Sequence, residues 1–94
     1  MKKLDQDFYN RADEHINLSN DQLSEASMEH VNASMMFSVT RFSSWISAYG
    51  HTSKEEFKKS KEETLNHLVK EYKDMLENNL DDYIENFDKY MGKK

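Results

Sequence analysis

The chain contains no proline and only two glycines, Gly50 and Gly92, among its 94 residues. Proline and glycine supply many of the turns that join β-strands and that punctuate long loops. A chain with so few of them can make few connections, so its regular segments must be long. This shortage predicts an all-α fold made of a few long helices.

The size and composition of the chain limit its core. A chain of 94 residues is at most one domain, and we expect residues 1–94 to form a single helical domain. Apolar residues make up 36% of it and charged residues 33%, so the expected core is modest. Because short chains bury a smaller fraction of their surface, a partner or a second copy is a candidate to complete this core.

Apolar residues recur three or four positions apart in three long segments, which is the spacing of one face of an α-helix. The predicted helices span about 4–24, 28–49 and 54 or 61 to 78, and a short C-terminal helix follows at about 80–91. The predicted fold is therefore a small helical bundle of three main helices plus the short one, with helix 28–49 at its centre.

The two starting points of the third helix come from two capping boxes, which are pairs of side chains that bond the free N–H groups of a helix start. Ser53 with Glu56 is the first pair, and Ser60 with Glu63 is the second. The chain therefore has the signals for a short turn at 54–59 and a restart at 61.

A break near Asn78 and Asn79 is predicted from charge. If residues 74–88 were one helix, five carboxylates would line a single strip, and like charges at this spacing repel. With Asn79 as N-cap, two of the carboxylates in the stretch fall in the first turn of a new helix, where the helix dipole favours them. The carboxylates of the strip are Asp74, Glu77, Asp81, Glu85 and Asp88.

Helix 28–49 is apolar on more than one side, and between Val31 and Tyr49 its only charge is Arg41. Such a helix is usually buried on more than one side, so it is predicted to be the central helix or the seam of a dimer. Trp45 is expected in the core, with a role as an interface anchor as the alternative. The dimer would use Val31, Met35, Phe42, Trp45 and Ile46.

Arg41 has three interpretations. It forms an ion pair with an acidic residue of another helix, extends its guanidinium to water, or binds an anion or a partner. The stretch from residue 77 to residue 88 also has three: a solvated helix face, a contact surface for a basic partner, or a weak cation site. The candidate interaction residues are Arg41, Trp45, Glu77, Asp81, Asp82, Tyr83, Glu85 and Asp88.

Few chemistries fit the remaining residues. The chain has no cysteine, its four histidines are isolated in the sequence, and no calcium-loop, zinc-helix or di-iron pattern occurs. No nucleophile motif or glycine-rich phosphate loop is present, so we expect no enzyme, no bound metal and no cofactor. The net charge of −5 argues against nucleic acid, and no segment resembles a signal peptide or a membrane span. A cytoplasmic protein is expected.

The chain resembles a family of small bacterial proteins that is known as a domain of unknown function. The similarity covers about residues 5–91, and the C-terminal block is its most distinctive part. It implies a bacterial, intracellular, stand-alone domain and carries no functional residue across. The similar stretches are Phe8-Tyr9-x-Arg11-Ala12-Asp13, Ser34 to Phe42, Lys61-Glu62-Glu63 and Tyr72-x-x-Met75-Leu76-Glu77-x-Asn79-Leu80-Asp81-Asp82-Tyr83.

These observations predict a non-catalytic, small, acidic helical protein that acts by protein–protein interaction or self-association, with a homodimer or a basic protein as the candidate partners. The alternative is a ligand- or cation-binding helical domain that uses the acidic strip at 77–88 or a pocket around Arg41.

Overall fold

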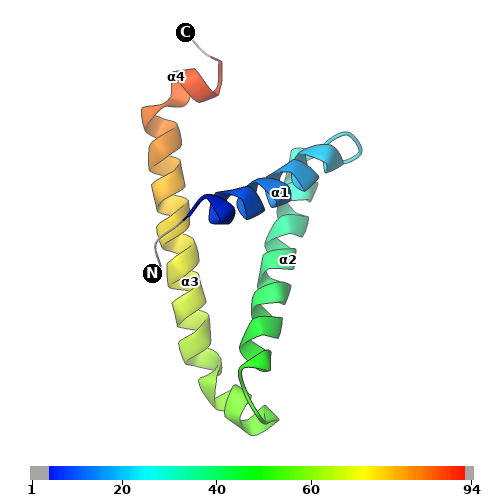
Figure 1. The fold of residues 1–94 in the computed structure, drawn as a ribbon, viewed down its shortest axis with the longest axis vertical. Coiled ribbons are helices and arrows are strands. Elements are labelled where there is room, and N and C mark those ends of the chain that lie inside the picture. The colour runs from blue at the N-terminus through cyan, green and yellow to red at the C-terminus, as the bar shows by residue number, and fades with distance from the viewer. Residues whose placement is uncertain (1–4, 93–94) are drawn as a thin grey trace. The chain divides into compact units, whose positions relative to one another are not determined.

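The computed structural model describes residues 5–92, and the regular secondary structure in this range is entirely helical (Figure 1). The helices are α1 (Gln6–Gln22), α2 (Met28–Tyr49), α3 (Lys54–Glu85) and α4 (Phe87–Tyr90). The predicted all-α class is confirmed, with three main helices and a short C-terminal one. Leu4, the predicted start of the first helix, lies outside the described residues.

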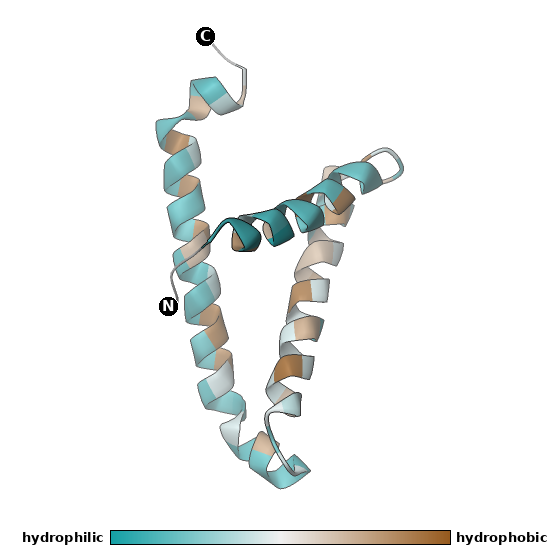
Figure 2. Ribbon diagram, in the orientation of Figure 1, coloured by the Kyte–Doolittle hydropathy of each residue, from teal (hydrophilic) through white to brown (hydrophobic). Residues whose placement is uncertain are grey.

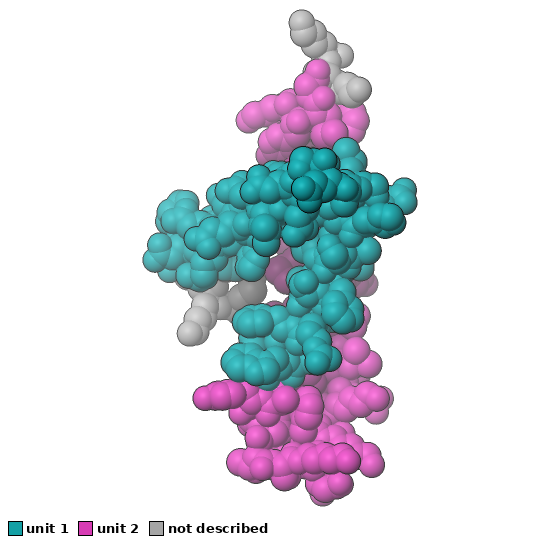
Figure 3. All heavy atoms as spheres, turned by 90° about the vertical axis from the view of Figure 1, so that its right-hand side faces the viewer, with its two compact units in different colours: residues 1–46 teal, residues 47–94 magenta. Residues whose placement is uncertain are grey.

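Two compact units divide the chain, residues 1–46 and residues 47–94 (Figure 3). The first unit contains α1 and most of α2. The second contains the last residues of α2, the turn that follows it, α3 and α4. The expectation of a single domain stays a prediction.

Side-chain caps fix where the three long helices begin. Asp5, Ser27 and Ser53 each accept a hydrogen bond from the backbone N–H three residues further on, at 2.9, 3.2 and 3.1 Å. A cap of this kind satisfies one of the N–H groups that a helix start leaves without a partner. The Ser53 capping signal is thus confirmed as the start of α3.

The predicted restart at residue 61 and the predicted break near Asn79 are both wrong, because α3 runs unbroken through Ser60 and Asn79. Ser60 donates its hydroxyl hydrogen to the carbonyl of Phe57 at 2.8 Å, and Asn79 donates its side-chain amide to the carbonyl of Met75 at 2.8 Å. Both side chains therefore bond backward along the helix. A side chain used in this way does not cap a new helix.

The helix ends at Asn86, whose backbone leaves the helical conformation at φ −110° and ψ 26°. The Asn86 side chain donates to the backbone carbonyl of Asp82 and to its Oδ1 atom, both at 3.0 Å. Tyr90 donates its hydroxyl to the same Oδ1 at 3.3 Å, and its ring lies 4.9 Å from the ring of Tyr83. The short helix α4 thus starts at Phe87, later than predicted. Asp82, which precedes the break, accepts hydrogen bonds from Asn86 at the break and from Tyr90 in α4.

Buried side chains are very few. Among the described residues, Val31 is the only buried one, with 6% of its area exposed. Apolar residues are spread along the helices with polar ones between them (Figure 2). Within the described chain α2 is exposed along most of its length, so its placement as a buried central helix is wrong, whereas the dimer seam stays a prediction. The placement of Trp45 in a core is also wrong: Trp45 is 60% exposed and stacks against Phe42 at 6.0 Å between ring centroids.

Replacing Ser53 with alanine should destabilise the protein, because the cap on the Glu56 N–H is lost. Loss of a serine N-cap typically costs about 1 kcal/mol of unfolding free energy. The measurement is urea unfolding followed by circular dichroism at fixed protein concentration. The matched control is Ser60→Ala, which removes a hydroxyl bonded within the helix and introduces the best helix-forming residue. Equal losses in the two variants would contradict the capping role.

The hydroxyl of Tyr90 should titrate above its ordinary pKa of 10.0, chiefly because it donates a hydrogen bond to Asp82; partial burial and the charges of Asp82 and Tyr83 act in the same direction. A raised pKa in the folded state means that this contact stabilises the fold below pH 10 and is lost as the pH rises through the raised value.

We expect Asp82→Ala to return the pKa of Tyr90 toward 10.0, measured by NMR titration of labelled tyrosine carbons. Asp81→Ala is the matched control, because it removes a neighbouring carboxylate without touching Tyr90. The same Tyr90 titration curve in both variants would show that Asp82 does not hold the hydroxyl.

Candidate functional site

One side of α3 carries a continuous row of half-exposed apolar side chains. Their spacing of three or four residues places them on one side of the helix. Each exposes between 43% and 56% of its area, which is unusual for residues of this size. The row is called the α3 apolar face below and consists of Leu65, Val69, Tyr72, Met75, Leu76, Leu80 and Tyr83.

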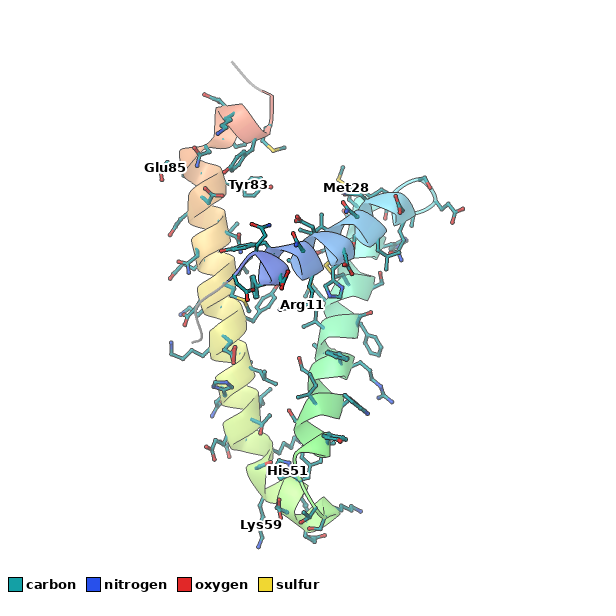
Figure 4. All side chains as sticks on the ribbon, viewed as in Figure 1. Arg11, Met28, His51, Lys59, Tyr83 and Glu85 are labelled. Carbon is teal, nitrogen blue, oxygen red and sulfur yellow. The ribbon has the colours of Figure 1, made fainter. Side chains whose placement is uncertain are left out.

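The acidic strip lies on the other side of the same helix. At about 100° per residue, the mean direction of Asp74, Glu77, Asp81 and Glu85 is roughly 160° away from that of the α3 apolar face. Figure 4 shows this opposition directly, because the labelled Tyr83 and Glu85 point to opposite sides of α3. Asp88 belongs to α4, so the predicted strip is divided between two helices. All of its carboxylates are exposed.

Local pairs reduce the charge repulsion that the sequence suggested. Lys70 lies 2.8 Å from the Asp74 carboxylate, and His67 lies 2.5 Å from that of Glu71. The hydrogen bond to Asp74 and then its negative charge raise the pKa of Lys70, against a smaller lowering by desolvation. Both pairs are four residues apart. Lys70 and Asp74 carry opposite charges, which support a helix at this spacing, whereas His67 contributes a charge only when its ring is protonated.

Arg41 lies on α2 with its side chain exposed, and it forms no ion pair with the described residues of its own unit, 5–46. Its neighbour on the helix, Phe42, stacks with Trp45, and both rings are more than half exposed. The structure therefore places Trp45 on the surface. It does not bring Arg41 and Trp45 together with residues 77–88 into one site.

A shallow concavity of about 460 Å³ lies within the second unit, between the start of α3 and the turn before it. His51 comes from this turn, where its Nδ1 lies 2.7 Å from the carbonyl of Ser47 and its ring lies 5.2 Å from that of Phe57. Because a carbonyl only accepts, the neutral ring carries its hydrogen on Nδ1 and leaves Nε2 as an acceptor. The lining residues are Ser47, His51, Ser60, Glu63, Thr64, His67 and Leu68.

Sequence reasoning treated His51 and His67 as isolated and missed this concavity. The available signal was the spacing of Ser60, Thr64 and His67, which places them along one side of α3. The lining offers hydroxyl and imidazole groups for hydrogen bonds. Across residues 5–92, however, no three histidine or acidic side chains gather closely enough to hold a metal ion.

Comparisons with known proteins identify the family of this helical chain. No curated protein matches the chain. The NMR structure of the protein NB7890A from Shewanella sp is similar, with 35% sequence identity and a TM-score of 0.78 over 97% of each chain. No helix in the described part of the chain is both long and apolar enough to cross a membrane. The family model for the protein of unknown function DUF3144 matches residues 8–84, and the chain therefore belongs to that family.

Proposed function

We propose that this chain is a non-catalytic helical protein that acts by protein–protein association, in the first place with a second copy of itself. The observation that carries the proposal is the contrast between a single buried side chain, Val31, and the many large apolar side chains left at the surface. Exposed apolar surface of this extent is typical of a contact site.

The energetic reason is the same in each unit. Burial of a large apolar side chain stabilises a fold by about 1.5–3 kcal/mol, and short isolated helices are only marginally stable in water. The described residues of the first unit bury Val31 alone, and those of the second unit bury none. A protein surface laid over these helices would supply the burial that each unit lacks.

An enzymatic role has little support. Catalytic groups are commonly desolvated and have strongly shifted pKa values. Among the described residues, the resolved pKa shifts belong to Lys70 and Tyr90. Both side chains are exposed, and local contacts with Asp74 and Asp82 explain both shifts. The concavity next to His51 is open and shallow, which suits a weak polar ligand better than a reaction that must exclude water.

The alternative function, binding of a ligand or cation, has less support than association. The strip at 77–88 is exposed, and residues 5–92 hold no metal-binding cluster. Arg41 is exposed and is not part of the concavity. A basic protein partner remains compatible with the strip. The proposal places the protein in the bacterial cytoplasm, in keeping with its lack of cysteine, and includes no nucleic acid because the net charge is −5.

Light scattering coupled to size exclusion should give about twice the chain mass of 11.2 kDa, with the dimer fraction rising with protein concentration. The thermal midpoint should rise with concentration as well, because association stabilises only the folded state. A mass of one chain at all concentrations, with a constant midpoint, would overturn self-association. Calorimetry with calcium, magnesium and phosphate tests the alternative, and we expect no heat of binding.

A further inference from the structure

We propose that the second copy docks antiparallel on the α3 apolar face, so that the α3 helices of two chains pack side by side around a two-fold axis near residue 74. This inference rests on the proposed self-association and names the surface and the orientation that it uses.

The spacing of the face suits helix-to-helix packing. Leu65, Val69, Tyr72, Leu76 and Tyr83 are separated by four, three, four and seven residues, the heptad rhythm of paired helices. Asn79 occupies the place between Leu76 and Tyr83. The amide of Asn79 already donates to the Met75 carbonyl. Burying this side chain in a helix pair therefore costs less free energy than burying a polar group without a hydrogen-bond partner.

The area of the face is enough for a stable contact. Its seven side chains are about half exposed, and fully burying such side chains removes about 60–120 Å² each. Covering the face removes about 600 Å² per chain, and a symmetric pair buries about 1,200 Å² in total. Specific interfaces begin at about this size, and a symmetric contact needs no second complementary surface.

The charges at the two ends of the face select the orientation. Lys58 and Lys61 continue the line of the face beyond Leu65, within roughly 40° of its mean direction, whereas Asp82 flanks its C-terminal end. Parallel helices would set these lysines against their own copies and Asp82 against Asp82 of the partner subunit. Antiparallel helices instead bring the lysines of one chain toward the acidic end of the other.

The total charge of α3 points the same way. Residues 54–69 carry four lysines and four glutamates, a net charge of 0, whereas residues 70–85 carry two lysines and six carboxylates, a net charge of −4. Parallel packing places the two −4 halves together, while antiparallel packing places each against a neutral half. This preference is weaker than that of the bordering charges, because most of these carboxylates lie on the side away from the face. The helix dipoles also favour the antiparallel pair. Matching the ends of the face then sets Leu65 level with Tyr83 of the partner subunit.

Spin labels test the orientation, and the absence of native cysteine makes single labelling simple. Lys59→Cys and Lys73→Cys are matched variants, since each removes one exposed lysine that is not among the charges bordering the face. With one label per chain, every measured distance joins two chains. Residue 73 lies next to the axis, so its labels should be within about 25 Å. Residue 59 lies about 15 residues from the axis, so its labels should be separated along the helix by about 45 Å at 1.5 Å per residue.

Each outcome has a definite meaning. Two similar short distances would show a parallel pair and overturn the orientation. A dimer mass with a long distance at residue 73 would place the contact on another face, such as that of Trp45, and overturn this inference while leaving the proposed function intact. A monomer mass would overturn both and indicate that the faces are covered within one chain.

A charge placed on the face gives an independent check. Leu76→Lys should raise the dimer dissociation constant at least tenfold. Asn78→Lys adds the same charge away from the face and should leave the dissociation constant within about twofold. Both are compared by sedimentation equilibrium after circular dichroism has verified helix content. If Leu76→Lys loses its helices, the label distances, measured with the apolar face unaltered, still decide the question.

Discussion

The helices of this chain need another surface to cover their apolar faces. An isolated helix gains little from its own hydrogen bonds, and most helical stability in proteins comes from packing one face against another surface. Here the helices are well formed and capped by Asp5, Ser27 and Ser53, yet among the described residues only Val31 is buried. Local interactions therefore define the helices, and the surface that covers them must define their stability.

The elements were predictable because they rest on local signals. The absence of proline, the apolar spacing and the Ser53 cap predicted the class and the main helices. The continuity of α3 through Asn79 was not predictable, because asparagine has two opposite uses. It caps a helix start when its side chain accepts an N–H, and it stays inside a helix when its side chain donates to a carbonyl four residues back. Which of the two occurs depends on the folded helix and not on the residue type. The predicted burial of Trp45 was wrong, because burial of a helix residue depends on which other side chains pack against it and not on local sequence.

The acidic residues of the C-terminal stretch have different physical roles although they look alike in the sequence. Asp82 is a structural acceptor that holds Asn86 and Tyr90 where the helix breaks. Asp74 pairs with Lys70, whereas Asp81 and Glu85 stand on the side away from the apolar face. Composition alone groups them as one site. The side of the helix on which each lies separates a fold-determining carboxylate from solvated ones.

This separation also limits what the acidic strip can contribute to recognition. A helix with its side chains is about 10–12 Å across, and salt at cellular strength screens exposed charges beyond about 8 Å. Carboxylates on the far side of α3 therefore act weakly on a chain packed against its apolar face. In the proposed pair, the relative orientation of the two α3 helices depends instead on the few charges that border that face, above all Lys58, Lys61 and Asp82. The strip contributes most of the net negative charge of the C-terminal half of α3. In the proposed pair, this charge would keep the outer side in water and oppose further stacking of pairs.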